Sequence, residues 1–294
     1  MNDTHTPVLS RSTCLICGTQ NLAESPLCIE CSAPMAIVHD VIAQEREPRI
    51  VSIVGESNVG KTVYLGFLLD MLSQRAGDFD AIPKGAYSVE LQQNVISHLA
   101  RRTFPPKTPM EAVEWHWAYY QVCRRGPSPK WVDLVMPDMA GESLAAELAG
   151  PNTFKVIRGL LRRSAGVMLL VDAGLAANGS PRGDFFALKI LSYIDALQAK
   201  KSDEKVDTPA AVVLCKADYC PECFDDPRSF AKANLNRLWN FCESRFTNVS
   251  FFASSVVGSL AYAISPKEDF VTPIPLHAAP QGVLEPFEWM INQL

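Results

Sequence analysis

Residues 55–62 read Gly-Glu-Ser-Asn-Val-Gly-Lys-Thr, a G-x-x-x-x-G-K-[ST] phosphate-binding loop. The apolar run Arg49–Val54 precedes the loop and the apolar segment Val63–Leu72 follows it, which predicts a strand before and a helix after. Glycines at both ends let backbone N–H groups turn toward a polyphosphate, and the helix start adds its positive end. We expect Lys61 to reach the β- and γ-phosphates and the Thr62 hydroxyl to ligate Mg²⁺. The pattern predicts a nucleoside triphosphate site made by Gly55, Glu56, Ser57, Asn58, Val59, Gly60, Lys61 and Thr62.

Four of the nine cysteines form two C-x₂-C pairs near the N-terminus, Cys14 with Cys17 and Cys28 with Cys31. Two pairs at this spacing can bring four thiolates to one tetrahedral Zn²⁺, and a site closed by four cysteines is structural. Disulfides are the alternative. However, residues 1–11 are polar and contain no signal peptide, so a cytoplasmic protein with reduced thiols is expected. We therefore predict a small zinc ribbon that is stabilised by its metal.

Composition limits the classes of function. Of the 294 residues, 48% are hydrophobic and 20% are charged, which is ordinary for a soluble globular protein of one or two domains. The net charge of −5 argues against binding of nucleic acid over a broad surface. The longest apolar stretches, Val167–Ala177 and Phe251–Ile264, are too short or too interrupted to span a bilayer, so no contact with a membrane is expected.

Beyond a connector at residues 36–48, apolar segments of strand type and helix type alternate. We expect strands at Ile50–Val54, Val113–Val122, Trp131–Met136, Gly166–Asp172, Ala210–Cys215 and Val249–Ala253, and helices at Lys61–Gln74, Val89–Arg101, Leu144–Arg163, Phe185–Lys200, Arg228–Arg245 and Glu285–Leu294. The second and third strands form a hairpin, so one edge of the sheet is antiparallel. This order predicts an α/β fold with a mostly parallel sheet, one antiparallel edge strand and helices on both faces. The expected domains are a zinc ribbon with its N-terminal tail (1–35), a linker (36–48) and a nucleotide-binding domain (49–294).

Two residues that could act on phosphate follow the strand predicted at Trp131–Met136. Ligands of open α/β sheets bind at the carboxyl ends of the strands. Asp138 can therefore hold Mg²⁺ or its water shell, and Gly141 can offer a free backbone N–H to the γ-phosphate. Asp133 is a competing metal ligand, but it lies in the middle of the strand, so we favour Asp138.

Base recognition is expected at two later strand ends. Asp218 can accept both N1–H and the exocyclic amino group of guanine, a pair of donors that adenine lacks, and the stem of Lys216 can cover the ring. Ser254 and Ser255 follow the strand predicted at Val249–Ala253, where backbone N–H groups could meet the guanine O6. These segments predict a preference for GTP and GDP.

In this order, the phosphate loop, Asp138-x-x-Gly141 and Lys216-x-Asp218 resemble the motifs of the translation-factor-related and Ras-like GTPases. The resemblance covers Arg49–Leu294 and implies the P-loop GTPase fold, a nucleotide-dependent switch and GTP hydrolysis with Mg²⁺. Carried over to this chain, it assigns phosphate and magnesium to Gly55, Gly60, Lys61 and Thr62, the second switch to Asp138 and Gly141, and guanine to Lys216, Asp218, Ser254 and Ser255.

The first switch of such GTPases carries a threonine without a fixed local motif. We choose Thr108 over Thr103, because Thr108 leads into the predicted hairpin strand as the family pattern requires. A zinc ribbon joined to a GTPase domain is also similar to GTPases of bacterial conflict-system gene clusters, which often occur with a second GTPase.

The chain departs from the pattern of these GTPases at two site positions. Cys215 stands where the family usually has Asn or Thr, which removes a side-chain contact to the phosphate loop. Glu142 follows Gly141 where many relatives carry the Gln that positions the attacking water. A carboxylate there could orient water but would repel the γ-phosphate, so slow unassisted hydrolysis is expected. The residues expected to act in catalysis are Lys61, Thr108, Gly141 and Glu142.

Three functions agree with these motifs. A regulatory GTPase, which binds a protein partner through its switches or its ribbon and which an activating protein could accelerate, is favoured. An ATP-using P-loop enzyme such as a kinase would need another base contact, and Asp218 argues against it. A nucleotide-binding scaffold without turnover is supported by Glu142 alone.

Overall fold

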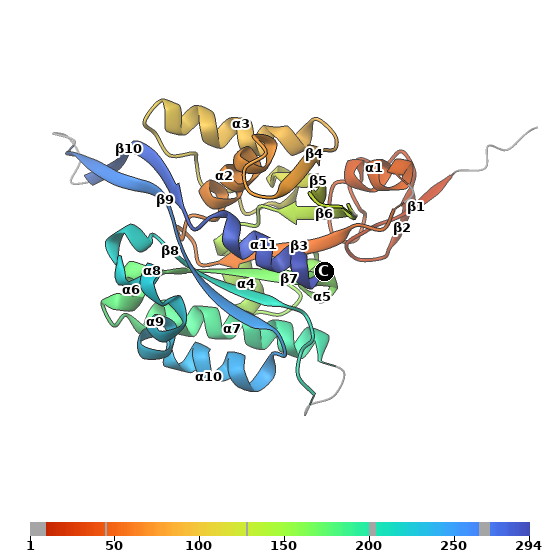
Figure 1. Cartoon of the computed structure of the whole chain (residues 1–294). Helices are drawn as coiled ribbons and strands as arrows, with labels where there is room; N and C mark the ends of the chain where they lie inside the picture. Colours follow the sequence, from red (N-terminus) through yellow and green to blue (C-terminus); the bar gives the residue numbers. More distant parts are fainter. Residues whose placement is uncertain (1–9, 45, 128, 200–203, 265–270) are drawn as a thin grey trace, which may run out of the picture.

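A mixed sheet of eight strands runs through the larger part of the chain (Figure 1). Its strands are β3 (Arg49–Gly55), β4 (Phe79–Pro83), β5 (Trp117–Arg124), β6 (Trp131–Pro137), β7 (Ser164–Asp172), β8 (Ala210–Cys215), β9 (Val249–Ile264) and β10 (Val271–Gln281). Their order is β10-β9-β8-β7-β3-β6-β5-β4. Pairing is parallel from β9 to β6, and antiparallel for β5 and β4 at one edge and for β10 at the other. The predicted α/β fold with a mostly parallel sheet is confirmed, and antiparallel strands extend it at both edges.

The computed structural model describes residues 10–44, 46–127, 129–199, 204–264 and 271–294. The tail at residues 1–9 that we joined to the ribbon, and the helix end predicted at Lys200, lie outside these ranges. The main helices are α1 (Ala36–Gln44), α2 (Lys61–Ser73), α3 (Tyr87–Ala100), α4 (Gly141–Ala149), α5 (Lys155–Arg163), α6 (Ala173–Ala177), α7 (Pro181–Gln198), α8 (Glu222–Asp225), α9 (Pro227–Asn234), α10 (Asn236–Arg245) and α11 (Leu284–Gln293). No helix within the described ranges has the length and apolar character needed to cross a bilayer.

Helices cover both faces of the sheet (Figure 1). On one face α2, α3 and α11 pack on the strands through buried residues such as Leu68, Val95 and Phe287. On the other face α4, α5, α7, α9 and α10 do so through residues such as Leu160 and Leu191. Burial of each such side chain stabilises the fold by about 1.5–3 kcal/mol. The strands at the centre of the sheet are therefore held from both sides.

The register of the parallel strands aligns their carboxyl ends. Gly55, the last residue of β3, lies opposite Leu170 of β7, and Asp172 ends β7 opposite Cys215. Cys215 in turn lies opposite Ser254 of β9. The phosphate loop and the segments that follow β7 and β8 therefore lie together at the carboxyl ends of the parallel strands, which is where ligands of open α/β sheets bind.

Two predicted helices are divided, and the last predicted strand is longer than expected. The segment Leu144–Arg163 forms α4 and α5, because Gly150 and Pro151 lie between them and proline removes a backbone donor and fixes φ. The segment Arg228–Arg245 is divided into α9 and α10. β9 continues beyond Ala253, because β10 pairs with it along its whole outer part.

The predicted linker is mostly helical. Residues 36–44 form α1, and an N-terminal hairpin of β1 (Arg11–Thr13) and β2 (Gln20–Leu22) precedes it. These elements lie on the opposite side of the molecule from β10 (Figure 1). Ile16 and Met35 are buried in the same apolar core as Leu160 of α5. The cysteine-bearing segment and the nucleotide-binding part of the chain therefore contribute to one apolar core.

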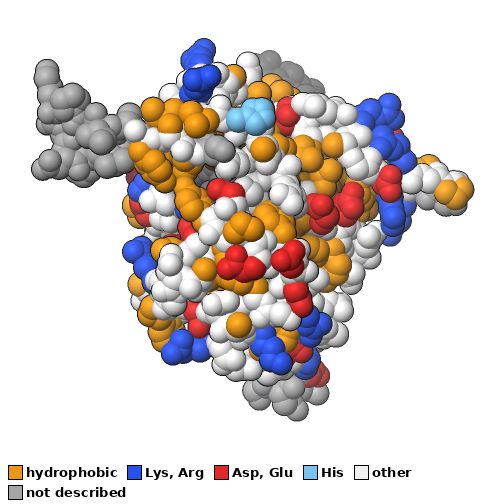
Figure 2. Space-filling model, turned by 60° about the vertical axis from the view of Figure 1, so that its left-hand side comes forward, with side chains coloured by type: hydrophobic (Ala, Val, Ile, Leu, Met, Phe, Trp, Pro, Cys, Tyr) orange, Lys and Arg blue, Asp and Glu red, His pale blue; other side chains and the backbone are white. Residues whose placement is uncertain are grey.

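Charged side chains are mixed on the surface that Figure 2 draws. Lys and Arg lie mainly toward its edges and are interspersed with Asp and Glu. The described residues of that face therefore offer no continuous basic surface of the kind that binds nucleic acid without sequence preference. The arrangement agrees with the net charge of −5.

Candidate nucleotide-binding site and cysteine cluster

The phosphate loop turns tightly between β3 and α2. Asn58 and Gly60 take left-handed conformations, with φ of 66° and 101°. Lys61 begins α2, and its Nζ donates to the carbonyl oxygens of Gly55 and Glu56 at 2.9 Å. Burial lowers the pKa of Lys61 to about 8, and nearby carboxylates oppose this shift. The loop therefore surrounds one cation that lies close to its backbone.

Three oxygen-bearing side chains meet at the start of α2. The Thr62 Oγ1 lies 3.0 Å from Thr108 Oγ1 and donates to the Asp138 carboxylate at 3.0 Å, and Thr108 Oγ1 donates to the same carboxylate at 2.9 Å. Neighbouring ligands of an octahedral Mg²⁺ at about 2.1 Å lie about 3.0 Å apart, so these oxygens fit such an ion. Burial raises the pKa of Asp138, while bonds from both threonines and the charge of Lys61 oppose that rise.

The competing candidates lie elsewhere. Thr103 Oγ1 donates to the His98 carbonyl oxygen at the end of α3, at 3.1 Å. Asp133 is buried in the middle of β6, where Tyr119 donates to one of its oxygens at 3.4 Å. Its other oxygen has no partner among the described residues. The structure brings Thr108 and Asp138, and neither of their alternatives, to the phosphate loop.

The start of α4 lies against the middle of the phosphate loop. A Cβ at Gly141 would come within 2.5 Å of the Ser57 backbone nitrogen, so only glycine fits this approach. Glu142 Oε1 accepts a hydrogen bond from Ser57 Oγ at 3.4 Å and lies 3.3 Å from Lys107 Nζ. Lys107 immediately precedes Thr108 in the sequence. Glu142 therefore bridges the loop and the segment that carries the predicted first-switch threonine.

The predicted base-reading residues come together at the other end of the site. Ser255 Oγ donates to Asp218 Oδ1 at 2.7 Å, which holds the carboxylate in place. Ser254 and Ser255 lie within β9 and not in a loop after it, because the strand continues. Ser254 Oγ is buried and has no hydrogen-bond partner among the described residues. Cys215 lies opposite Ser254 on the neighbouring strand and carries a thiol where an Asn would carry an amide.

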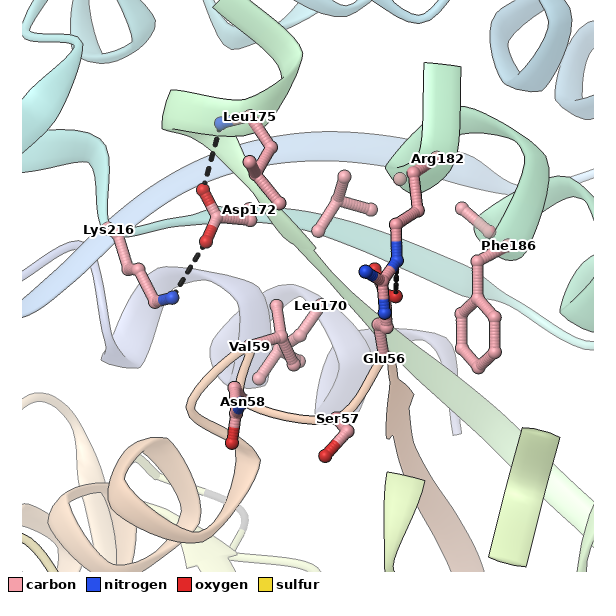
Figure 3. Close-up of a pocket in the computed structure, with 13 residues that line it drawn as sticks. Glu56, Ser57, Asn58, Val59, Leu170, Asp172, Leu175, Arg182, Phe186 and Lys216 are labelled. Atoms are coloured by element: carbon pink, nitrogen blue, oxygen red, sulfur yellow. Dashed lines mark hydrogen bonds and ion pairs between the residues drawn. The ribbon is translucent and has the colours of Figure 1, made fainter. Parts of the chain in front are cut away.

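Lys216 is held by a residue that the sequence did not single out. Lys216 takes a left-handed conformation with φ of 56°, and its Nζ donates to Asp172 Oδ2 at 2.7 Å. The other Asp172 oxygen accepts from the Leu175 backbone at 3.0 Å, so this carboxylate caps α6 and fixes Lys216 at once (Figure 3). Its place at the end of a predicted strand was the signal that could have identified Asp172.

One cavity of about 850 Å³ connects these groups. It is lined by the loop residues from Ser57 to Thr62, by Phe104–Thr108, by Gly141 and Glu142, by Cys215, Lys216, Asp218 and Ser254, and by Val257, Leu260, Tyr262 and Pro273 of β9 and β10. Tyr219 and Tyr262 close one side, with their hydroxyl oxygens 3.1 Å apart. This wall from β9 and β10 was not predicted, because it depends on the continuation of β9.

A second, smaller pocket of about 180 Å³ also lies against the phosphate loop and shares Ser57, Asn58 and Lys216 with the larger cavity (Figure 3). Arg182, from the start of α7, forms an ion pair there with Glu56. Glu56 is thereby paired with a cation outside the 850 Å³ cavity. Its side chain consequently adds little negative charge where a phosphate would lie.

The four N-terminal cysteines converge as their spacing predicts. Their sulfur atoms all lie within 4.8 Å of one another, with 3.7 Å between Cys14 and Cys31 and 3.5 Å between Cys17 and Cys28. Sulfurs at the corners of a tetrahedron around Zn²⁺ lie about 3.8 Å apart when the Zn–S bonds are about 2.3 Å, so the cluster fits zinc. The contact with Cys31 lowers the pKa of Cys14 to about 5, which favours the thiolate.

The chain resembles solved GTPase structures at low sequence identity. It is similar to the signal recognition particle receptor complex of Chaetomium thermophilum, at 13% identity and a TM-score of 0.40 over 72% of this chain and 92% of that chain. It is also similar to the GTP-bound GTPase-like domain of Ski7 from S. cerevisiae, at 18% identity and a TM-score of 0.39 over 72% of this chain and 45% of that chain. Among curated proteins, no sequence is significantly similar to it.

The family comparison matches more than half of the chain. The sequence model of the Double-GTPase 1 family covers residues 52–217, from the strand before the phosphate loop to the segment after β8. That range contains the loop, Asp138, Gly141 and Lys216. The chain belongs to the Double-GTPase 1 family of P-loop GTPases.

Proposed function

We propose that this protein is a Mg²⁺-dependent GTP-binding switch that hydrolyses GTP slowly and engages a protein partner. The observation that carries the proposal is the shared cavity, which is lined at one end by the phosphate loop, Thr108 and Gly141 and at the other by Asp218. A nucleotide with its triphosphate on the loop reaches Asp218 with its base. The carboxylate accepts two adjacent donors of guanine in one bidentate pair.

In the proposed mechanism Lys61 pairs with the β- and γ-phosphate oxygens, and the Gly141 backbone N–H donates to the γ-phosphate. Thr62, Thr108 and Asp138 would hold Mg²⁺, which supplies positive charge to the phosphate oxygens when bound. Glu142 orients the attacking water. A bond forms between the water oxygen and Pγ, and the bond from Pγ to the β–γ bridging oxygen breaks. Its electron pair leaves with GDP, and the water proton ends on inorganic phosphate.

Slow turnover follows from the charges around the γ-phosphate. No arginine is found among the described residues that line the cavity, and Glu142 brings negative charge to it. A partner that inserts an arginine would supply the missing cation and accelerate hydrolysis, by about 10³–10⁵-fold in GTPases that use this device. The two switch segments are the surface that such a partner would contact, and the zinc ribbon offers a second one.

Two other functions remain to be distinguished from this one. An ATP-using enzyme would bind adenine at least as well as guanine, and a nucleotide-binding scaffold would bind GTP without turnover. The geometry at Asp218 favours guanine, since Ser255 already holds the carboxylate by one oxygen. The Thr62, Thr108 and Asp138 cluster favours a magnesium-bound triphosphate.

The test is a titration of GTP, GDP and ATP with and without Mg²⁺, combined with phosphate release under saturating GTP. We expect GTP to bind far more tightly than ATP, because a carboxylate left without its donors costs about 1–3 kcal/mol or more. Asp218→Asn should lower the affinity for GTP and raise the affinity for XTP, because the O2 of xanthine can accept a hydrogen bond from the Asn amide. Asp225→Asn, an exposed change in nearby α8, is the matched control. Equal affinity of the unmodified protein for ATP and GTP would refute the proposal.

A further inference from the structure

Three ion pairs lie around the phosphate loop, and both members of two of them line the 850 Å³ cavity. Arg182 pairs with Glu56 in the smaller pocket, and Lys216 pairs with Asp172 at the end of β7. The third pair, Lys107 with Glu142, lines the 850 Å³ cavity with both of its members. Its charges therefore act directly on whatever occupies that cavity.

The backbone holds Glu142 at the γ-phosphate end of the site. Gly141 packs so closely on the loop that a Cβ would lie 2.5 Å from the Ser57 nitrogen, and Glu142 is the next residue. Its carboxylate reaches Ser57 Oγ in the middle of the loop. The α- and β-phosphates extend from there toward the base, so this carboxylate would face the γ-phosphate and not the phosphates that GDP retains.

The segment that carries Lys107 is fixed at the next residue. The next residue, Thr108, is anchored by its contacts with Thr62 and Asp138 at 3.0 and 2.9 Å. Lys107, which also lines the cavity, places its ammonium group 3.3 Å from Glu142 Oε1. The pair thus joins the segment before β5 to the start of α4 directly over the loop.

We propose that Lys107 makes the site favour a triphosphate over a diphosphate, because its charge offsets that of Glu142 beside the γ-phosphate. Without Lys107 the Glu142 carboxylate would face the γ-phosphate uncompensated, and like charges at such short range repel. GDP would not experience this repulsion. Lys107 is therefore a specificity-determining residue for GTP over GDP. This inference rests on the proposed function as a GTP-binding protein.

The experiment compares affinities for GTPγS and GDP, at fixed Mg²⁺, for the unmodified protein, Lys107→Ala, Glu142→Gln and the double variant. Lys107→Ala should lower the affinity for GTPγS by about fivefold, which is the upper range for an exposed ion pair, and leave the affinity for GDP unchanged. In the Glu142→Gln background the same change should have little effect, because no carboxylate is left to offset. Lys107→Arg should retain the affinity of the unmodified protein.

Arg228→Ala is the matched control, because Arg228 and Glu243 form an ion pair of nearly equal exposure away from the cavity. The proposal is overturned if Lys107→Ala lowers the affinities for GDP and GTPγS equally. It is also overturned if the effect on GTPγS affinity persists in the Glu142→Gln background. Failure of the proposed function would look different: the unmodified protein would then bind neither guanine nucleotide, or would bind ATP as well as GTP.

Discussion

Loss of zinc should destabilise the whole chain and not the cysteine segment alone. The cysteine segment docks on α5, where Ile16 lies so close to Gly159 that a Cβ there would meet the Ile16 carbonyl oxygen at 2.9 Å. Arg163 Nη1 also donates to the Leu15 carbonyl oxygen at 2.8 Å. A cluster without metal cannot keep this short segment folded. Chelation or Cys14→Ser should therefore expose the apolar face of α5.

The magnitude follows from the buried contact. Ile16 is 3% exposed, and loss of its burial costs about 2–3 kcal/mol. The Arg163 bond is exposed to solvent and adds little. Each kcal/mol lost from the free energy of unfolding lowers the midpoint temperature of thermal unfolding by about 2–4 °C for a domain of this size. The chain should therefore unfold at a midpoint about 4–12 °C lower without zinc.

Thermal unfolding followed by circular dichroism, with zinc content measured in the same samples, tests this reasoning. Ile16→Ala should retain zinc and still lower the midpoint, because it removes the docking contact and leaves the cysteines. Ile29→Ala, at a position 83% exposed in the same segment, should change neither quantity. A zinc-free chain that melts at the same temperature as the zinc-bound chain would show that the segment is an independent appendage.

Three further predictions concern the nucleotide site. Because burial lowers the pKa of Lys61 to about 8, GTP affinity should fall as pH rises above that value, and a pH-independent affinity in calorimetric titrations would contradict this. The nucleotide-free chain should instead become more stable between about pH 8 and 10, because lysine in the unfolded chain keeps its proton to higher pH. Thermal unfolding across the same pH range measures this second trend. Cys215→Asn should tighten GTP binding by supplying an amide to the unpaired Ser254 Oγ, and weaker binding in a titration would oppose this view. Gly141→Ala should abolish GTP turnover measured as phosphate release, since its Cβ collides with the Ser57 backbone, and normal turnover would exclude the proposed approach.

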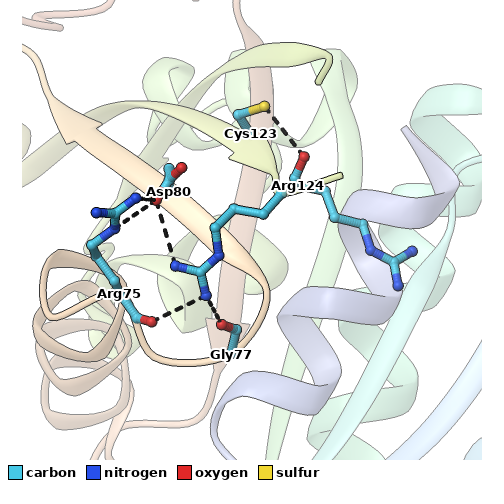
Figure 4. A network of polar contacts seen from close by, with 6 residues as sticks. Arg75, Gly77, Asp80, Cys123 and Arg124 are labelled. Atoms are coloured by element: carbon cyan, nitrogen blue, oxygen red, sulfur yellow. Dashed lines mark hydrogen bonds and ion pairs between the residues drawn. The ribbon is translucent and has the colours of Figure 1, made fainter. Parts of the chain in front are cut away.

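Some of the fold was beyond prediction from the sequence because its strands are defined by their partners. β4 is a short strand whose segment shows no clear alternation, and it forms because β5 pairs with it residue by residue. Arg75 pairs with Asp80, and Arg125 adds bonds to the carbonyl oxygens of Arg75 and Gly77, which fixes the turn before the strand (Figure 4). The pairing of β4 with β5 joins residues far apart along the chain, so local propensity does not reveal it.

The sequence by itself determined the phosphate loop, the two C-x₂-C pairs and the strand ends that carry Asp138 and Asp218. These signals are local, because a tight glycine turn, a thiolate pair or a buried strand needs only a few consecutive residues. Only the tertiary structure decided which distant side chains meet. Thr62 and Thr108 are 46 positions apart, and Ser57 and Glu142 are 85 apart. Strand order and helix packing bring such pairs together, and these depend on the burial of the whole core and not on any single segment.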